Sequence, residues 1–246
     1  MGRIFDMAKE QWGNNFIFVF TNDHGGQWPL GKWNLYDSGT RIPLMAVWPG
    51  KIKAGSRTDA MVSWVDILPT LLDLSGEKVP ADIDGQSFGP VLLGERNVHR
   101  DRIFTTHTGD GVMNVFPIRS VRIGKYKYIW NLRPDAWHTN HSDRDRLDGA
   151  GAYWDSWDVA AKTDPKAAAI LKNYYTRPAE EFFDLERDPL EYNNLASLPE
   201  HSGQVKEFRE IVEQWAKDQG DDLQPHREPY PTSKPLPELR RPETGK

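Results

Sequence analysis

The sequence predicts an α/β protein in two parts: a parallel or mixed sheet sandwiched by helices, followed by a smaller α+β subdomain with a short antiparallel sheet and a C-terminal helix. Two continuous apolar runs, at residues 16–20 and 43–48, favour the first part, because strands buried on both faces of a sheet lack polar alternation. Shorter, partly alternating runs after residue 100 favour the second part.

The composition excludes several classes of protein. The chain has 246 residues, a formal net charge of −5 and no cysteine. A disulfide scaffold, a thiolate zinc site and a cysteine nucleophile are therefore excluded. The mild acidity, with charges of both signs interspersed, argues against a nucleic-acid binder, and no apolar run is long enough for a membrane span. The N-terminal residues have neither the basic nor the apolar stretch of a signal peptide.

The first part contains a predicted helix before its strands and another after them. A helical pattern from Ile4 to Trp12 precedes the strand at residues 16–20. After the strand at residues 43–48, residues 64–74 show helical spacing, with Asp66 as the expected cap and Gly76 as the expected end.

The second part contains four predicted strands, a loop and a helix. Gly124 and Lys125 separate two of the strands and are typical of a hairpin turn. Residues 225–246 contain six prolines and are expected to be disordered or draped over the surface. The strands are expected at residues 103–107, 115–123, 126–132 and 182–185, the amphipathic helix at 205–217, and a polar loop with a short helix at 140–162.

A polar, glycine-rich loop directly after the first strand carries the most chemistry. Asp23 and His24 stand side by side there, and ligand sites in α/β sheets gather at the carboxyl ends of strands. Both side chains can reach one divalent metal only if the chain curls, which Gly25 and Gly26 permit. The alternative is that Asp23 and His24 only cap the loop.

Lys32 follows in the same loop, eight residues after His24. Its compact ammonium group suits an anionic oxygen, and the alternative is a solvated loop lysine. The spacing from Gly26 to Lys32 also approaches a phosphate-binding P-loop. However, Trp33 stands where that motif needs Ser or Thr, and Pro29 removes a backbone N–H, so the sequence disfavours a nucleotide site.

Several collinear motifs resemble the type I sulfatases, a branch of the alkaline-phosphatase-like superfamily. Residues 18–25 (Phe-Val-Phe-Thr-Asn-Asp-His-Gly) resemble the second metal motif of the family, and residues 65–74 resemble a typical family helix. Within the family, the sequence is most similar to sulfamidase-like (heparan N-sulfatase-like) members, which share the spacing to Lys32. The other matching segments are residues 43–50, 84–87, 117–122, 125–128, 181–189 and 194–196.

The resemblance implies roles for five residues. Asp23 and His24 would be two ligands of a divalent metal, usually calcium, and the histidine leaves magnesium or manganese open. Lys32 would be a catalytic and substrate-binding residue that neutralises charge on the sulfate during its transfer. His107 and Asp110 would contact the hydroxyls or the amine of a sulfated sugar, unless their segment is a surface turn.

The catalytic nucleophile departs from the family pattern. Type I sulfatases use a formylglycine made from a Cys/Ser-x-Pro/Ala-x-Arg motif, which this sequence lacks. The resemblance therefore implies a C-terminal half that is inactive without an N-terminal half, from a parent protein that is exported by family habit. Residues 1–98 would be the end of the catalytic domain, residues 99–224 the C-terminal subdomain and residues 225–246 a Pro-rich tail.

The expected function of the parent enzyme is hydrolysis of sulfate esters or sulfamates of sulfated saccharides. The alternatives are a phosphoester or phosphonate hydrolase of the same superfamily and a non-catalytic carbohydrate-binding remnant. Among ten tryptophans, Trp137, Trp154 and Trp157 flank a polar loop and could form a sugar platform, although core packing is favoured. His138 and His141 in that loop are expected to be solvated.

Overall fold

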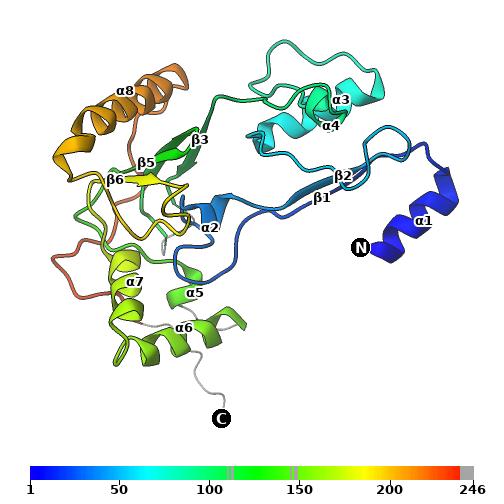
Figure 1. The fold of residues 1–246 in the computed structure, drawn as a ribbon. Helices are drawn as coiled ribbons and strands as arrows, with labels where there is room; N and C mark the ends of the chain where they lie inside the picture. Colours follow the sequence, from blue (N-terminus) through cyan, green and yellow to red (C-terminus); the bar gives the residue numbers. More distant parts are fainter. Residues whose placement is uncertain (110, 112–113, 145, 147–148, 239–246) are drawn as a thin grey trace. The chain divides into compact units, whose positions relative to one another are not determined.

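The computed structural model describes residues 1–109, 111, 114–144, 146 and 149–238 (Figure 1). Its backbone contacts divide the chain into two units. Unit 1 contains residues 1–22 and 43–103, and unit 2 contains residues 23–42 and 104–246. The loop with Asp23, His24 and Lys32 thus belongs to unit 2, and the predicted domain boundary at residues 98–99 stays a prediction about the parent enzyme. No helix within the described ranges is long and apolar enough to cross a membrane.

Unit 1 contains a helix and a pair of strands near its N-terminus. Helix α1 (Gly2–Trp12) ends at Gly13, as predicted, and strands β1 (Phe18–Thr21) and β2 (Leu44–Val47) pair antiparallel. The predicted parallel sheet is wrong, because the described strands form only antiparallel pairings with defined register. An apolar run indicates burial but not direction. Parallel neighbours need a long crossover, usually a helix, and only the short helix α2 (Asp37–Thr40) lies between β1 and β2.

The rest of unit 1 is organised around the buried carboxylate of Asp66. The helix predicted at residues 64–74 forms as a 3-10 turn (Trp64–Asp66) followed by helix α3 (Ile67–Ser75). Helix α3 ends at Gly76, which has φ 80°, and helix α4 (Gly89–Leu92) comes next in the chain. Asp66 does not cap the first turn of α3. Its carboxylate instead accepts the backbone N–H groups of Ser63 and Gln86, both at 2.9 Å, and pairs with Arg100. One side chain therefore joins three segments of unit 1.

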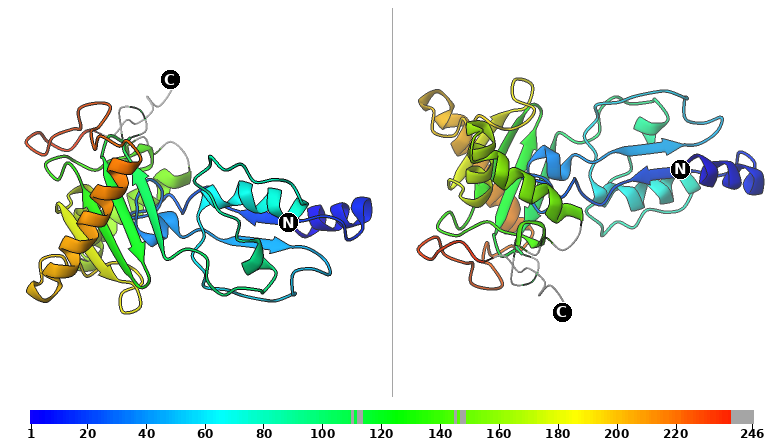
Figure 2. Two further views of the ribbon diagram at one scale, coloured as in Figure 1. Left: turned by 90° about the horizontal axis from the view of Figure 1, so that it is seen from above. Right: turned by 90° about the horizontal axis from the view of Figure 1, so that it is seen from below.

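Unit 2 is built on the sheet β3-β4-β5-β6. Its strands are β3 (Arg102–His107), β4 (Ile118–Ile123), β5 (Tyr126–Asn131) and β6 (Glu180–Asp184). The predicted hairpin is confirmed: β4 and β5 pair antiparallel around Gly124, which has φ 56°. Val121, Tyr128 and Phe182 lie opposite one another across β4, β5 and β6 and pack under helix α8 (Ser202–Asp218), which crosses the sheet (Figure 2).

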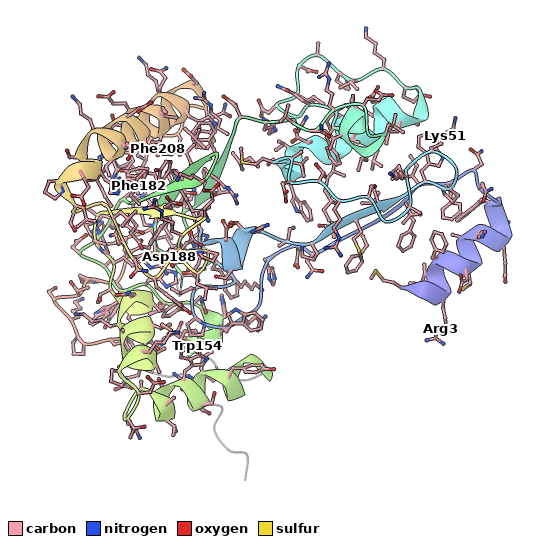
Figure 3. All side chains as sticks on the ribbon, viewed as in Figure 1. Arg3, Lys51, Trp154, Phe182, Asp188 and Phe208 are labelled. Carbon is pink, nitrogen blue, oxygen red and sulfur yellow. The ribbon has the colours of Figure 1, made fainter. Side chains whose placement is uncertain are left out.

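Aromatic side chains pack helix α8 against the sheet. The rings of Phe182 on β6 and Phe208 on α8 meet edge to face, 5.2 Å apart (Figure 3). The amphipathic helix predicted at residues 205–217 is therefore confirmed, and its apolar face is the one that packs. A 3-10 turn (Pro199–His201) leads into α8.

The other face of the sheet packs against the loop of residues 23–42 and several helices. The region predicted as a polar loop with a short helix contains helices α5 (His141–Arg144) and α6 (Gly149–Ala160). Helix α7 (Pro165–Tyr175) was not predicted, although its start has a clear signal: Asp164 accepts the N–H of Lys166 at 2.8 Å, and Pro165 stands at the first helical position. The core on this face includes Leu35, Tyr36, Ile118, Ile129, Trp154, Tyr174 and Phe183.

The Pro-rich tail is draped over unit 2 where it is described. Pro231 forms a β-bridge with Ala136, and the N–H of Trp137 donates to the carbonyl of Tyr230 at 2.8 Å. Backbone pairing therefore holds this part of the tail, and residues 239–246 lie outside the described part of the chain.

Candidate functional site

The loop of residues 23–42 is folded by backbone contacts that only glycine allows. The N–H of Gly25 donates to the carbonyl of Gly39 at 3.0 Å, and the N–H of Lys32 donates to the carbonyl of Gly26 at 2.8 Å. A Cβ at Gly25 would lie 1.8 Å from the carbonyl oxygen of Ser38. Gly25 is therefore needed for close backbone packing. The same fold brings the backbone of Lys32 into contact with Gly26, which is two residues after His24.

A buried ionic cluster attaches this loop to the sheet. Lys127 on β5 is 3% exposed and contacts Asp37 at 2.5 Å, Glu191 at 3.0 Å and the carbonyl oxygen of Leu35 at 3.1 Å. Arg122 makes a second contact with Asp37 at 3.1 Å. Burial raises the pKa of the Glu191 carboxyl, which the Lys127 ammonium partly offsets. This attachment was not predicted, because the partners are far apart in the sequence.

A second attachment reaches the backbone of Lys32 itself. Arg177 is buried and donates to the side-chain oxygen of Asn34, and Asn34 donates to the carbonyl of Lys32 at 3.0 Å. The Arg177 guanidinium also lies 5.1 Å from the Tyr36 ring centroid. Trp33 has φ 63°, a left-handed conformation that is unusual for a bulky residue. Buried hydrogen bonds on either side therefore hold the strained backbone of Trp33, next to the predicted catalytic residue Lys32.

The ammonium group of Lys32 lies over an aromatic ring. Its Nζ is 4.0 Å from the Trp33 ring centroid, and the residue is half-buried. Within the described ranges, no carboxylate forms an ion pair with Lys32. The Trp33 ring therefore positions the Lys32 ammonium group, and no acidic side chain of the described residues neutralises its charge there. A positioned, uncompensated ammonium group suits an anionic ligand.

Asp23 and His24 turn their side chains to the same side, as a shared metal requires. Asp23 Oδ2 lies 3.2 Å from His24 Nε2, and Asp23 Oδ1 accepts the His24 backbone N–H at 3.0 Å. His24 Nδ1 lies 2.7 Å from the carbonyl oxygen of Gly25. The two ring nitrogens of His24 therefore face oxygen atoms on both sides, the Gly25 carbonyl at Nδ1 and the Asp23 carboxylate at Nε2.

These two side chains fit part of a metal site. Calcium takes about six to eight oxygen ligands. The described residues contain no group of three or more His, Cys, Asp or Glu side chains that could hold a metal. Asp23 and His24 could therefore bind a divalent cation only together with further ligands.

Of the two predicted sugar-contacting residues, only His107 lies in the described part of the chain. It ends β3, and its carbonyl accepts from Arg119 at 3.0 Å. Arg119 also pairs with Asp221. Asp110 lies outside the described residues.

The prediction that His138 is solvated is wrong. The ring is fully buried, 4.6 Å from the Tyr174 ring and 5.3 Å from the Phe116 ring. Burial, the Arg177 charge and His107 lower its pKa well below the usual value, so the imidazole is neutral at pH 7. The Trp33 backbone also lies beside it. The loop of Lys32 and the end of β3 with His107 thus meet around one buried histidine.

We expect His138 to make unit 2 sensitive to acid. The unfolded chain binds a proton at His138 below pH about 6.5, whereas the folded chain does not, so the free energy of unfolding decreases by up to about 1.4 kcal/mol per pH unit below that value. His138→Phe, which keeps the aromatic packing, should remove this dependence. Urea unfolding of both proteins at pH 7 and pH 5.5 measures it, and equal losses in the two proteins would contradict the assignment.

Trp154 and Trp157, inside the 140–162 segment, pack in the core of unit 2. Trp154 is fully buried and its Nε1 donates to the carbonyl of Gln27 at 3.2 Å (Figure 3 labels it). Trp157 packs against the same core, and Trp137 Nε1 donates to the carbonyl of Lys234 at 2.8 Å. Trp154 is therefore excluded from a sugar platform.

Comparison with known proteins identifies one family. Residues 26–156 match the family model described as "N-sulphoglucosamine sulphohydrolase, C-terminal". The chain is 32% identical over 213 residues to an ulvan-active sulfatase of Formosa agariphila, covering 85% of this chain and 39% of that protein. It is 26% identical to the human N-sulphoglucosamine sulphohydrolase, covering 82% of this chain and 41% of that protein.

A solved structure shares the fold. It is that of BT4656 in complex with its substrate D-glucosamine-2-N,6-O-disulfate, which matches with a TM-score of 0.64 and 24% identity over 90% of this chain and 38% of the other. The chain therefore spans about two fifths of the length of each of these three proteins.

Proposed function

This chain belongs to the sulfatase family, with the C-terminal domain of N-sulphoglucosamine sulphohydrolase, and on that premise we propose that it forms part of an enzyme that hydrolyses sulfate esters or sulfamates of sulfated saccharides. The observation that carries the proposal is the match to a sulfatase along 85% of the chain. The loop geometry supports it, since an unpaired lysine and two metal-ligand side chains share one short, firmly held loop. The remaining part of the enzyme would supply the formylglycine nucleophile, because this chain lacks the Cys/Ser-x-Pro/Ala-x-Arg motif.

Asp23 and His24 would hold a divalent metal, most simply calcium, with ligands from the rest of the enzyme. The metal would polarise the sulfate oxygens. The Asp23 carboxylate would supply oxygen ligands, and His24 Nε2, 3.2 Å from Asp23 Oδ2, would be the nitrogen ligand beside them.

Lys32 would bind the sulfate group and stabilise charge that develops as the sulfur–oxygen or sulfur–nitrogen bond breaks. The Trp33 ring orients the ammonium group, and the bonds from Arg177 through Asn34 hold the backbone in place. A donor that is positioned before the reaction needs no reorganisation during it, which is the main source of such catalysis. His107 and Asp110 would contact the sugar.

We expect Lys32→Ala to lower kcat about 100-fold or more in a sulfatase assembled from this chain and the N-terminal part of the Formosa agariphila relative, because one preorganised charge at the transition state is lost. Lys32→Arg should keep part of the activity, and Asp23→Asn should raise the calcium concentration that gives half the maximal rate. The measurement is sulfate release from sulfated saccharides, with the exposed Lys53→Ala as the matched control.

The outcomes separate the candidate functions. Unchanged activity in Lys32→Ala would remove the role assigned to that lysine. Faster turnover of phosphate monoesters than of sulfate esters would favour the phosphoester hydrolase. Binding of sulfated oligosaccharide without any turnover by the assembled protein would favour a non-catalytic remnant.

A further inference from the structure

The C-terminal tail lies along the segment that connects β5 to helix α5. We call its residues 228–238 the tail strap. The N–H of Thr232 donates to the carbonyl of Asp135 at 2.7 Å, beside the β-bridge already described. The ring N–H of Trp137 donates to the carbonyl of Lys234 at 2.8 Å. Both contacts use backbone groups of the tail strap, so they depend on its path and not on its side chains.

The tail strap also binds a buried arginine on α5. Arg144 is 5% exposed, and its Nη1 donates to the carbonyl of Pro237. Its other guanidinium nitrogens donate to the carboxylate of Asp143 and, at 3.0 Å, to the hydroxyl of Tyr175. Asp143 is fully buried and also accepts the hydroxyl of Tyr174 at 2.9 Å. The Pro237 carbonyl thus gives the last guanidinium nitrogen of a buried ion pair its acceptor, and it joins α5 to the tail strap.

The same segment contacts Trp33 through two histidines. The ring of His141, the first residue of α5, lies 5.5 Å from the Trp33 ring, with an interplanar angle of 33°. The backbone of Trp33 lies beside the fully buried His138. The Trp33 ring in turn lies 4.0 Å from the ammonium nitrogen of Lys32. Residues 137–144 therefore contact both the tail strap and the residue that positions Lys32.

Trp33 has a backbone conformation that depends on its surroundings. Its φ of 63° is left-handed, which is costly for a bulky residue and persists only where neighbouring groups hold it. Asn34 donates to the carbonyl of Lys32 and so holds the backbone there, and His141 contacts the ring itself. Because the Lys32 side chain is flexible, the ring that its ammonium group contacts determines where that charge lies. A shift of His141 would therefore move the charge as well.

We propose that the tail strap positions the Lys32 ammonium group. Its contact with Arg144 holds α5, whose first residue, His141, holds the Trp33 ring on which that group lies. Arg144 and His141 are positioning residues, because they act through Trp33. Four of the eleven residues of the tail strap are prolines, which lowers the conformational entropy lost when it is ordered. The catalytic consequence rests on the proposed function, whereas the position of the ammonium group does not.

The first test compares two shortened chains by NMR. A chain that ends at Glu238 keeps every contact of the tail strap described above, whereas a chain that ends at Gln224 lacks them all. The ring current of Trp33 shifts the ε-methylene protons of Lys32 upfield, and their absence in Lys32→Ala identifies them. We expect the chain ending at Glu238 to keep this upfield shift and the chain ending at Gln224 to lose most of it. A synthetic peptide of residues 225–238 should restore the shift.

Full-length variants test the same path without removing any residue. His141→Ala should lose most of the upfield shift, and His141→Phe, which keeps a ring against Trp33, should retain it. Arg144→Lys should lose part of the shift, because an ammonium group does not reproduce the planar fork that reaches three acceptors. The matched control is Ser233→Ala, an exposed position in the tail strap, which should retain the full shift.

The assembled sulfatase gives the catalytic readout. His141→Ala should lower kcat about 10-fold, a smaller loss than that of Lys32→Ala, because the charge is displaced and not removed. His141→Phe should stay close to the unchanged enzyme.

Each outcome decides for or against the tail strap. An upfield shift that persists in the chain ending at Gln224, or in His141→Ala, overturns the proposal. If the chain ending at Gln224 unfolds, the His141 variants decide in the same way. A lost shift in His141→Ala with unchanged sulfate release leaves the tail strap in place and rejects the role of Lys32 in the proposed function.

Discussion

Lys127→Met is expected to lower the free energy of unfolding of unit 2 by about 3–5 kcal/mol. The ammonium group is buried between Asp37 and Glu191, and its removal leaves two carboxylates without their shared cation in a site of low dielectric. The pKa of Glu191, already raised by burial, should rise further. The loop of Lys32 should loosen as well, because Lys127 also donates to the carbonyl of Leu35.

Hydrogen exchange followed by mass spectrometry, together with urea unfolding, measures this effect. Peptides covering residues 30–40 should exchange faster than in the unchanged chain. Lys125→Met is the matched control: this lysine stands two residues away and pairs with Asp184 at 3.0 Å, but it is one-third exposed, so its loss should destabilise unit 2 much less than Lys127→Met does. Equal destabilisation by both variants would show that burial of the Lys127 pair is not what stabilises the loop.

Asp66→Ala is expected to destabilise unit 1 by a similar amount, about 3–5 kcal/mol. The substitution leaves the Arg100 guanidinium without its carboxylate and two backbone N–H groups without acceptors. Burial raises the pKa of Asp66, but the hydrogen bonds from Arg100, Gln86 and Ser63 outweigh it and hold the pKa below the usual value. The ionised form therefore stabilises the fold at neutral pH, and that contribution is lost as the pH falls through this lowered pKa.

Peptides from residues 61–75 and 84–100 should lose their exchange protection in Asp66→Ala. Asp66→Asn should lie between Ala and the unchanged chain, because the amide oxygen can still accept one of the backbone N–H groups. The exposed pair of Asp101 with Arg102 gives the control, since Asp101→Ala should change the stability by less than about 1 kcal/mol. Protection that persists in Asp66→Ala would contradict a central role for this carboxylate.

Elements defined by local signals could be predicted from the sequence. The hairpin around Gly124 was predicted because two alternating runs flank a glycine that must turn the chain. The end of α3 was predicted because Gly76 adopts the left-handed conformation there. The amphipathic face of α8 was predicted because its period matches a helix.

Features that depend on distant partners could not be predicted. The direction of β2 relative to β1 depends on the path of the connecting loop, which residue types do not encode. His138 looked solvated because its neighbours in the sequence are polar, yet Phe116 and Tyr174 bury it. In the candidate site, Asp23, His24 and Lys32 are predictions made from motifs. Lys127, Asn34 and Arg177, which hold the loop, have no local signature.

The sequence separations between the loop and its anchors have a consequence for synthesis. Tyr36 donates to Glu181, 145 residues later, and the N–H of Asp37 donates to Glu191, 154 residues later. A growing chain that has already produced Asp23, His24 and Lys32 therefore cannot order them until β6 and the turn after it have emerged. Loss of the chain from Arg177 onward would remove three anchors of this loop, Arg177, Glu181 and Glu191, although Asp23, His24 and Lys32 themselves remain. The proposed sulfate-binding loop is thus among the last parts of unit 2 to mature.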